Sequence, residues 1–295
     1  MLTISEMVVL GAAVPEQTKN NGKTVCVAGW AEDLGLVRIY PCRADYGIKR
    51  WSRLRNIQVN RNPKDSRIES YKLNSERSFE LGKDIESPEE KTELLDNISQ
   101  DCVYHVRDNM LSLGLIKVNG QIDCVIEENP SFSKQQHISK TVQDDRWLMT
   151  KQDFPVQPKF KFFCGEKCES QKGHNLTVIE WGGFEWMRKS PNKIGNLGDN
   201  WKINNPNFNI YLLIGNVARH KNSFIIISVI PVKKADHSTL ALFPDIQRQK
   251  KNTGRYTIQQ SVLGIVSKIR NKPDHRNLDK IIADLQPAWD ALAKR

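Results

Sequence analysis

The sequence predicts a mainly β (α+β) protein with two OB-like β-barrel modules, a helical insert and a helical C-terminal tail. Three observations lead to this fold class: strand-like runs occur in two groups, a helical pattern interrupts the first group, and helical periodicity fills the last sixty residues. The 295 residues, 39% hydrophobic and 26% charged, suit a soluble protein of about two domains.

The first module is expected over residues 1–128. Strands are predicted at residues 4–10, 24–30 and 36–40, with further strand candidates at 57–60 and 69–73. Ser87-Pro88-Glu89-Glu90 is typical of a helix start, and apolar residues at helical spacing follow it. Asn119-Gly120 between two apolar runs predicts a hairpin over residues 115–126. Strands, a helix and then more strands is the order of an OB-fold, although an SH3-like barrel with an insertion would look similar.

The second module is expected over residues 156–235, after a polar linker at 129–155. Strands are predicted at residues 160–163, 176–181, 210–214 and 223–229, with a short helix at 184–189 and a long loop at 190–209. Residues 236–295 form the predicted helical C-terminal region, whose apolar stripe is typical of core packing.

The net charge of +10 is concentrated in two stretches. Residues 43–67 include eight basic and two acidic residues, and residues 186–255 include twelve basic and three acidic residues. Between them, residues 68–150 include nine basic and sixteen acidic residues. Clustered Lys and Arg side chains release counterions from phosphates, so nucleic acid is the expected partner. A solvated basic surface without a partner is the alternative.

Aromatic residues lie among the cations of both stretches, as in proteins that hold single-stranded nucleic acid. Packing of these aromatic side chains in the core is the alternative interpretation. The predicted nucleic-acid contacts are Arg38, Arg43, Lys49, Arg50, Trp51, Arg53, Arg55, Trp186, Arg188, Lys189, Arg219 and Lys221.

Cys164, Cys168 and His174 form the best candidate for a metal site. Thiolate and imidazole ligands suit zinc, and a structural zinc site needs four of them. His220 is a candidate for the fourth ligand, and ordinary turn and core cysteines are the alternative. The other four cysteines are interpreted as free buried thiols.

An enzyme is the less favoured class. The chain has no Walker A loop, no G-x-G-x-x-G motif and no G-x-S-x-G motif. The enzyme hypothesis is a metal-dependent nuclease that uses His174 and Glu180, with Glu185 nearby. A binding protein without a catalytic residue is the favoured interpretation.

Four phrases carry a resemblance to a known family. They are KTVCVAGWAEDLGLVRIYP, RIESYKL, FKFFCGEKCESQKGHNLTVIEWGGFEWMRK and YLLIGNVARHKNSFIIISVI, and the likeness spans about residues 4–232. The chain resembles bacterial dual OB-containing domain proteins. The resemblance implies two OB modules, nucleic-acid binding by analogy of fold, and an accessory role in a bacterial defence or mobile-element system.

The sequence also predicts the cellular location and the partners of the protein. No signal peptide and no apolar run of about 18 residues is evident, so a cytoplasmic protein without a membrane partner is expected. The alternative function is a protein-interaction subunit that docks on a larger effector through its C-terminal helices.

Overall fold

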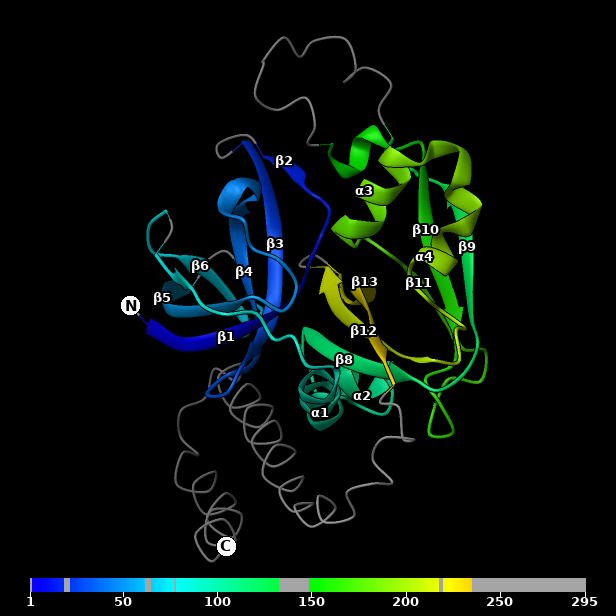
Figure 1. Ribbon diagram of the computed structural model, residues 1–295, viewed down its shortest axis with the longest axis horizontal. Coiled ribbons are helices and arrows are strands. Elements are labelled where there is room, and N and C mark those ends of the chain that lie inside the picture. The colour runs from blue at the N-terminus through cyan, green and yellow to red at the C-terminus, as the bar shows by residue number, and fades with distance from the viewer. Residues whose placement is uncertain are drawn as a thin grey trace, which may run out of the picture. The chain divides into compact units, whose positions relative to one another are not determined.

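The computed structural model describes residues 2–18, 22–61, 65–76, 78–132, 149–217 and 220–234 (Figure 1). These residues fold into two β-rich halves with two helices where the halves meet. The predicted helical tail, residues 236–295, lies outside the described residues. No helix in the described ranges is long and apolar enough to cross a membrane.

The first half is a closed five-stranded barrel. Its strands are β1 (Leu2–Ala12), β3 (Gly22–Ala31), β4 (Gly35–Arg43), β5 (Arg53–Arg61) and β6 (Ser70–Leu73). The barrel closes in the order β1-β3-β4-β6-β5-β1, and only the β4–β6 pair is parallel. This order fits the OB-like module expected from the sequence. Three short elements, β2 (Glu16–Thr18), η1 (Ala44–Tyr46) and β7 (Glu80–Leu81), lie at its margins.

Apolar side chains at alternate positions along the strands fill the interior of the barrel. Met7, Val27, Val37, Ile39 and Ile57 each expose 1% or less and pack in one apolar cluster inside the barrel. Because side chains of a strand alternate between its two faces, the residues between them point out of the barrel wall.

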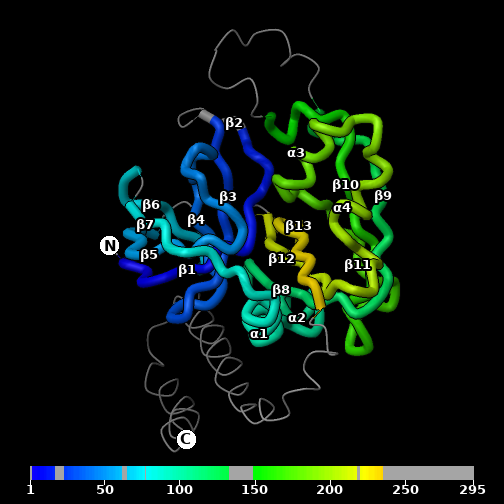
Figure 2. Tube along the Cα trace, viewed as in Figure 1, coloured from blue at the N-terminus to red at the C-terminus, as the bar shows by residue number. Residues whose placement is uncertain are grey.

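The helical insert lies outside the barrel. The sequence interpretation placed it between barrel strands, but all five barrel strands precede α1 (Pro88–Ile98) and α2 (Val103–Asp108). The start of α1 is as predicted, because the side chain of Ser87 accepts a hydrogen bond from the backbone N–H of Glu90 and Pro88 occupies the first turn. Both helices lie against β8 of the second half (Figure 2).

The second half contains two three-stranded antiparallel sheets. One has the order β11-β10-β9, with β9 (Ile122–Glu128), β10 (Val156–Phe162) and β11 (His174–Thr177). The other has the order β13-β12-β8, with β8 (Leu113–Val118), β12 (Phe208–Val217) and β13 (His220–Lys233). A parallel bridge from Val178 to Ile226 links the two sheets. Elements η3 (Lys151–Asp153), α3 (Trp181–Lys189), η4 (Pro191–Asn196) and α4 (Leu197–Asn200) connect the strands.

The predicted hairpin at residues 115–126 is wrong in its pairing. Both strands exist, but β8 pairs with β12 and β9 pairs with β10. Asn119 sits between them and donates its backbone N–H to the carbonyl oxygen of Cys164. The two strands therefore act as one interrupted strand that is shared by two sheets.

The expected linker at 129–155 falls in the sequence between two paired strands of the second half, β9 and β10. Its described ends are well packed. Asn129 is buried, and its side-chain amide donates to the carbonyl oxygens of Lys151 and Phe154. Thr150 and Asp153 form a capping box at η3.

Candidate metal centre

Four sulfur and nitrogen ligands converge in the second half. The side chains of Cys102, Cys164, Cys168 and His174 have all their ligand atoms within 4.8 Å of one another. Within the described residues this is the only group of three or more His, Cys, Asp or Glu side chains arranged to hold a metal ion.

Three separate segments supply these ligands. Cys102 is the residue before α2, and it is fully buried. Cys164 and Cys168 belong to the turn after β10, where the backbone N–H of Cys168 donates to the carbonyl oxygen of Gly165. His174 begins β11 and lies opposite Phe162 on β10.

A positive φ angle places His174 in the cluster. Gly173 has φ of 72°, in the left-handed region that favours glycine. A Cβ at this position would also lie 2.9 Å from the carbonyl oxygen of Phe162. Glycine therefore permits the turn that returns the chain to β10 with the imidazole directed at the thiols.

The distances suit tetrahedral zinc. The Nε2 atom of His174 lies 3.4 Å from the Sγ of Cys168 and 3.5 Å from the Sγ of Cys102. Zn–S bonds of about 2.3 Å and a Zn–N bond of about 2.05 Å at the tetrahedral angle separate sulfur from nitrogen by about 3.6 Å. Three thiolates and one imidazole also form a closed set, typical of structural rather than catalytic zinc.

Burial and hydrogen bonding shift the pKa values of three cluster residues in different directions. Burial lowers the pKa of His174 and so favours the neutral imidazole, the form that binds metals. Burial raises the pKa of the Cys164 thiol. For Cys168 burial acts in the same direction, but hydrogen bonds from the backbone at Cys164 and Ser170 and from neighbouring thiols outweigh it, so its pKa is lowered.

Aromatic rings enclose the imidazole. The ring of Tyr104 meets His174 edge-on, with 5.1 Å between centroids, and the ring of Phe162 lies 5.5 Å away. Both rings limit the freedom of the imidazole and restrict access of water to the cluster.

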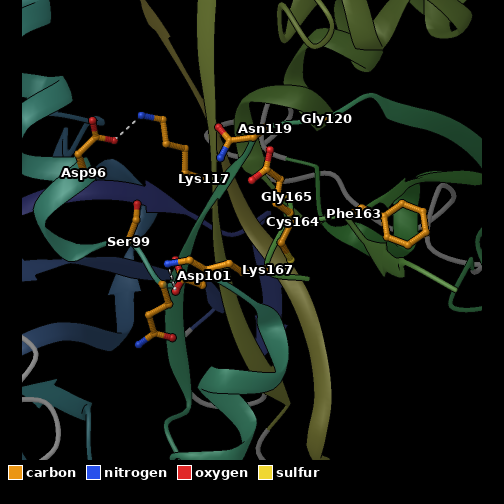
Figure 3. A pocket seen from close by; sticks show the side chains of 12 residues that line it. Asp96, Ser99, Asp101, Lys117, Asn119, Gly120, Phe163, Cys164, Gly165 and Lys167 are labelled. Carbon is orange, nitrogen blue, oxygen red and sulfur yellow. Dashed lines mark hydrogen bonds and ion pairs between the residues drawn. The ribbon is translucent and has the colours of Figure 1, made fainter. Parts of the chain in front are cut away.

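A cavity of about 690 Å³ adjoins the cluster, with Cys164 in its wall (Figure 3). Four of the charged side chains in its wall form two ion pairs: Lys117 binds Asp96 at 2.7 Å, and Lys167 binds Asp101 at 3.2 Å. These lysines and carboxylates neutralise one another at the cavity wall.

The fourth ligand differs from the one expected. Sequence reasoning considered His220, but His220 is exposed at the start of β13 and is not a member of the cluster. Cys102 takes that place, although the sequence interpretation counted it among the free buried thiols. Cys102 is distant from the other three in sequence, so no local spacing could identify it.

Glu180 has a structural role that the nuclease hypothesis did not foresee. It is the N-cap of α3, and its carboxylate accepts hydrogen bonds from the backbone N–H of Gly183 at 3.0 Å and from the Nε1 of Trp201 at 2.5 Å. It also forms an ion pair with Arg50 of the first half. Glu185 pairs with Arg188. Glu180 is therefore fully engaged and does not join His174.

Several predicted nucleic-acid contacts are engaged within the protein. Arg38 exposes only 2% of its surface and donates to the carbonyl oxygen of Ser112, so it is an interior residue and not a surface contact. Arg53 pairs with Glu6 and Glu90, and Arg55 pairs with Glu6.

The remaining predicted contacts are scattered. Lys49, Lys189 and Lys221 are exposed, and Arg43 is exposed but pairs with Asp45 and Glu76. Trp51 is half-buried with Lys91 over its ring, and Trp186 packs against the core of the second half. Arg219 lies outside the described residues. The structure thus does not gather the eleven of these residues that it describes into one surface.

Comparison with protein families divides the chain near the start of the second half. Residues 3–98 match the model of a domain of unknown function (DUF8758), and residues 98–247 match the model of another (DUF8757). A comparison with curated proteins found no significant match. Because the second model covers just over half of the 295 residues, the chain belongs to the family described as a domain of unknown function, DUF8757.

Proposed function

We propose that this chain is a nucleic-acid-binding protein with little sequence preference, built from two OB-like modules, with a zinc ion in the second. The observation that carries the proposal is the closed five-stranded barrel. Its strand order and its single parallel pair are those of a fold that binds oligonucleotides in many proteins. Fold analogy needs support from surface chemistry, and the net charge of +10 supplies it.

The strand pairing of the second half supports a second OB-like module. The interrupted strand β8–β9 takes the position of β1, since it pairs with β12 through its first part and with β10 through its second. The parallel bridge between Val178 and Ile226 corresponds to the parallel β4–β6 pair of the first barrel. Helix α3 then lies between the third and fourth strands, where an OB-fold has its helix.

Zinc is the metal that best suits the cluster, and its proposed role is structural. Cys102 lies more than 60 residues before the Cys164–Cys168 turn and His174 in the sequence, and the three segments come together only in the folded chain. A bound ion would hold the start of α2 and the start of β11 against the end of β10. Because such a site exists only in the folded chain, its binding free energy stabilises the fold.

Phosphate contacts are favoured over base stacking in this proposal. Trp201 and Tyr211, two aromatic residues of the second basic stretch, are buried, and Trp186 is partly buried. Exposed lysines such as Lys49, Lys189 and Lys221 remain to contact a ligand. Cations that neutralise phosphates bind all sequences about equally, which accounts for the low sequence preference.

The test is a fluorescence-anisotropy titration of the full chain with labelled single-stranded 20-mers of unrelated sequence. The proposal expects dissociation constants in the micromolar range or tighter at about 100 mM salt, with similar values for all sequences. Absence of binding at a protein concentration of about 50 μM, well above that range, would overturn it.

A further inference from the structure

The face that OB-folds commonly use for binding is covered in this protein. That face lies on the second and third strands of the barrel, which here are β3 and β4. Ala28 on β3 and Leu36 and Arg38 on β4 point out of the barrel wall, yet each exposes 5% or less. Arg38 donates its Nη2 to the carbonyl oxygen of Ser112 at 2.7 Å, and β4 contacts β8 of the second half. A ligand must therefore bind elsewhere on the barrel.

A second surface arises where the end of the barrel meets the β12–β13 hairpin. Arg67, in the connection between β5 and β6, donates its Nη1 to the carbonyl oxygen of Asn216 at 3.0 Å. The side-chain amide of Asn216 donates in turn to the carbonyl oxygen of Lys221 at 3.0 Å. These two contacts place residues of the two basic stretches side by side, although they are far apart in sequence.

Exposed basic side chains belong to the elements that meet at this contact. Arg61 and Lys72 are exposed on β5 and β6 of the barrel, and His220 and Lys221 are exposed at the start of β13. We call Arg61, Lys72, His220 and Lys221 the basic rim. Arg61 is fixed by the ring of Tyr71, 4.9 Å from its guanidinium carbon, and by the carbonyl oxygen of Ile68.

Carboxylates in the described part of the chain neutralise Arg53 and Arg55, but they do not neutralise the basic rim. Among the described residues, no ion pair with a carboxylate involves Arg61, Lys72 or Lys221. Both carboxylates in the described part of the β5–β6 connection are already engaged: Asp65 is bound to Arg67 and Ser70, and Glu69 accepts hydrogen bonds from the backbone N–H and the hydroxyl of Ser112. The rim therefore keeps its positive charge available to an external anion.

We propose that the phosphate backbone of a single-stranded nucleic acid binds along the basic rim, across the junction of the two halves. The inference rests on the proposed function and specifies its site. It requires both halves, because Lys72 belongs to the barrel and Lys221 to the β12–β13 hairpin. Arg67 is a positioning residue in this site, since its guanidinium holds the two elements together.

The test compares two double charge reversals in the full chain. The rim variant is Lys72→Glu with Lys221→Glu. The matched control is Lys83→Glu with Lys161→Glu, which changes the net charge equally at exposed positions away from the rim. Binding of a labelled oligodeoxythymidine 20-mer is measured by anisotropy at several salt concentrations, and thermal melting verifies that each variant is folded.

The rim variant is expected to bind about 10- to 100-fold more weakly at 100 mM salt, and its log–log salt slope should fall by about 1.4, or 0.7 for each lost phosphate contact. The control should remain within about threefold of the unaltered chain. If the rim variant fails to fold, Lys72→Ala with Lys221→Ala replaces it, with an expected loss of about 3- to 30-fold.

The outcomes separate this inference from the proposed function. A rim variant that binds as tightly as the control would overturn the rim while nucleic-acid binding stands. An unaltered chain that binds no oligonucleotide would overturn the proposed function itself. Equal losses in the two variants would also contradict the rim, because they would show a dependence on net charge alone.

Discussion

At the scale of single residues, Cys102 connects the metal cluster to the junction of the halves. It precedes α2, and α2 leads within a few residues to Ser112. Ser112 donates its backbone N–H and its hydroxyl to the carboxylate of Glu69 at 2.7 and 2.8 Å, and its carbonyl oxygen accepts from Arg38. A ligand that fixes the start of α2 therefore also supports the contact with the barrel.

Replacing Cys102 with Ser is expected to remove the metal. Three ligands remain, and a hydroxyl is a poor zinc ligand, so zinc measured by plasma mass spectrometry should fall from about one per chain to below about 0.3. Thermal stability should fall as well, by about 3 kcal/mol or more, since metal binding is coupled to folding. Cys124→Ser is the control, because Cys124 lies in the same half outside the cluster. Equal zinc content in the two variants would show that Cys102 is no ligand.

Asp65 predicts a pH dependence of stability. Burial acts to raise its pKa, but hydrogen bonds from Arg67 and Ser70 outweigh burial and hold the pKa at about 2, below the usual 3.8. The ionised Asp65 therefore contributes its full stabilisation to the free energy of unfolding above about pH 4, and this stabilisation is lost as the pH falls through 2. Asp65→Asn should lower the free energy of unfolding at pH 7 by about 1 kcal/mol, after allowance for solvent screening.

That difference should shrink as the pH is lowered from 4 to 2, as measured by urea unfolding. Asp84→Asn, at an exposed position, should show no such trend. A difference between Asp65→Asn and the unaltered chain that stayed constant with pH would contradict the role of the Arg67 ion pair.

At the scale of elements, β1 and β13 approach closely at Gly11, where the side chain of Ser228 leaves no room for a second side chain. A Cβ on Gly11 would lie 2.3 Å from the Cβ of Ser228, which is fully buried. Gly11 also adjoins an irregularity in the β1–β3 register. The backbone of β1 therefore packs directly against the Ser228 side chain of β13 at this point.

Gly11→Ala should destabilise the fold by about 1–3 kcal/mol, because the added methyl forces the two strands apart. Gly195→Ala is the matched control, since nothing lies within 4 Å of its Cβ position, and it should change stability by less than about 0.5 kcal/mol. Chemical denaturation measures both. Equal stabilities would mean that β1 and β13 separate at little cost.

Helix α1 shows what local sequence can predict. Its start was identified from the Ser87 cap and the proline after it, which act within one turn. Most strands were also located, because alternation is a local pattern. The pairing of β8 and β9 was not predicted, because their partners β12 and β10 come later in the chain and no local pattern points to them.

The candidate site was predictable only where its residues are neighbours in sequence. Cys164, Cys168 and His174 were found from their spacing, whereas Cys102 was not. Partners that are distant in sequence also explain why the ion pairs of the arginines were not predicted. Arg50 and Glu180 are 130 residues apart, and no charge count along the chain could show that they pair.

At the scale of the whole molecule, each half carries different parts of the proposed sites. The barrel presents one wall to the second half and keeps the end that carries Arg61 and Lys72 exposed. The second half contributes the proposed zinc centre and the hairpin that carries Lys221. The nucleic-acid binding that we propose for this arrangement is mainly electrostatic, so the affinity should depend on salt concentration.

The dependence of oligonucleotide affinity on salt tests the central claim most directly. For the full chain and an oligodeoxythymidine 20-mer, the logarithm of the association constant should fall linearly with the logarithm of salt between about 50 and 300 mM. A slope between about −2 and −4 is expected, which corresponds to three to six neutralised phosphates. Undetectable binding, or an affinity that stays flat over this range, would contradict the account.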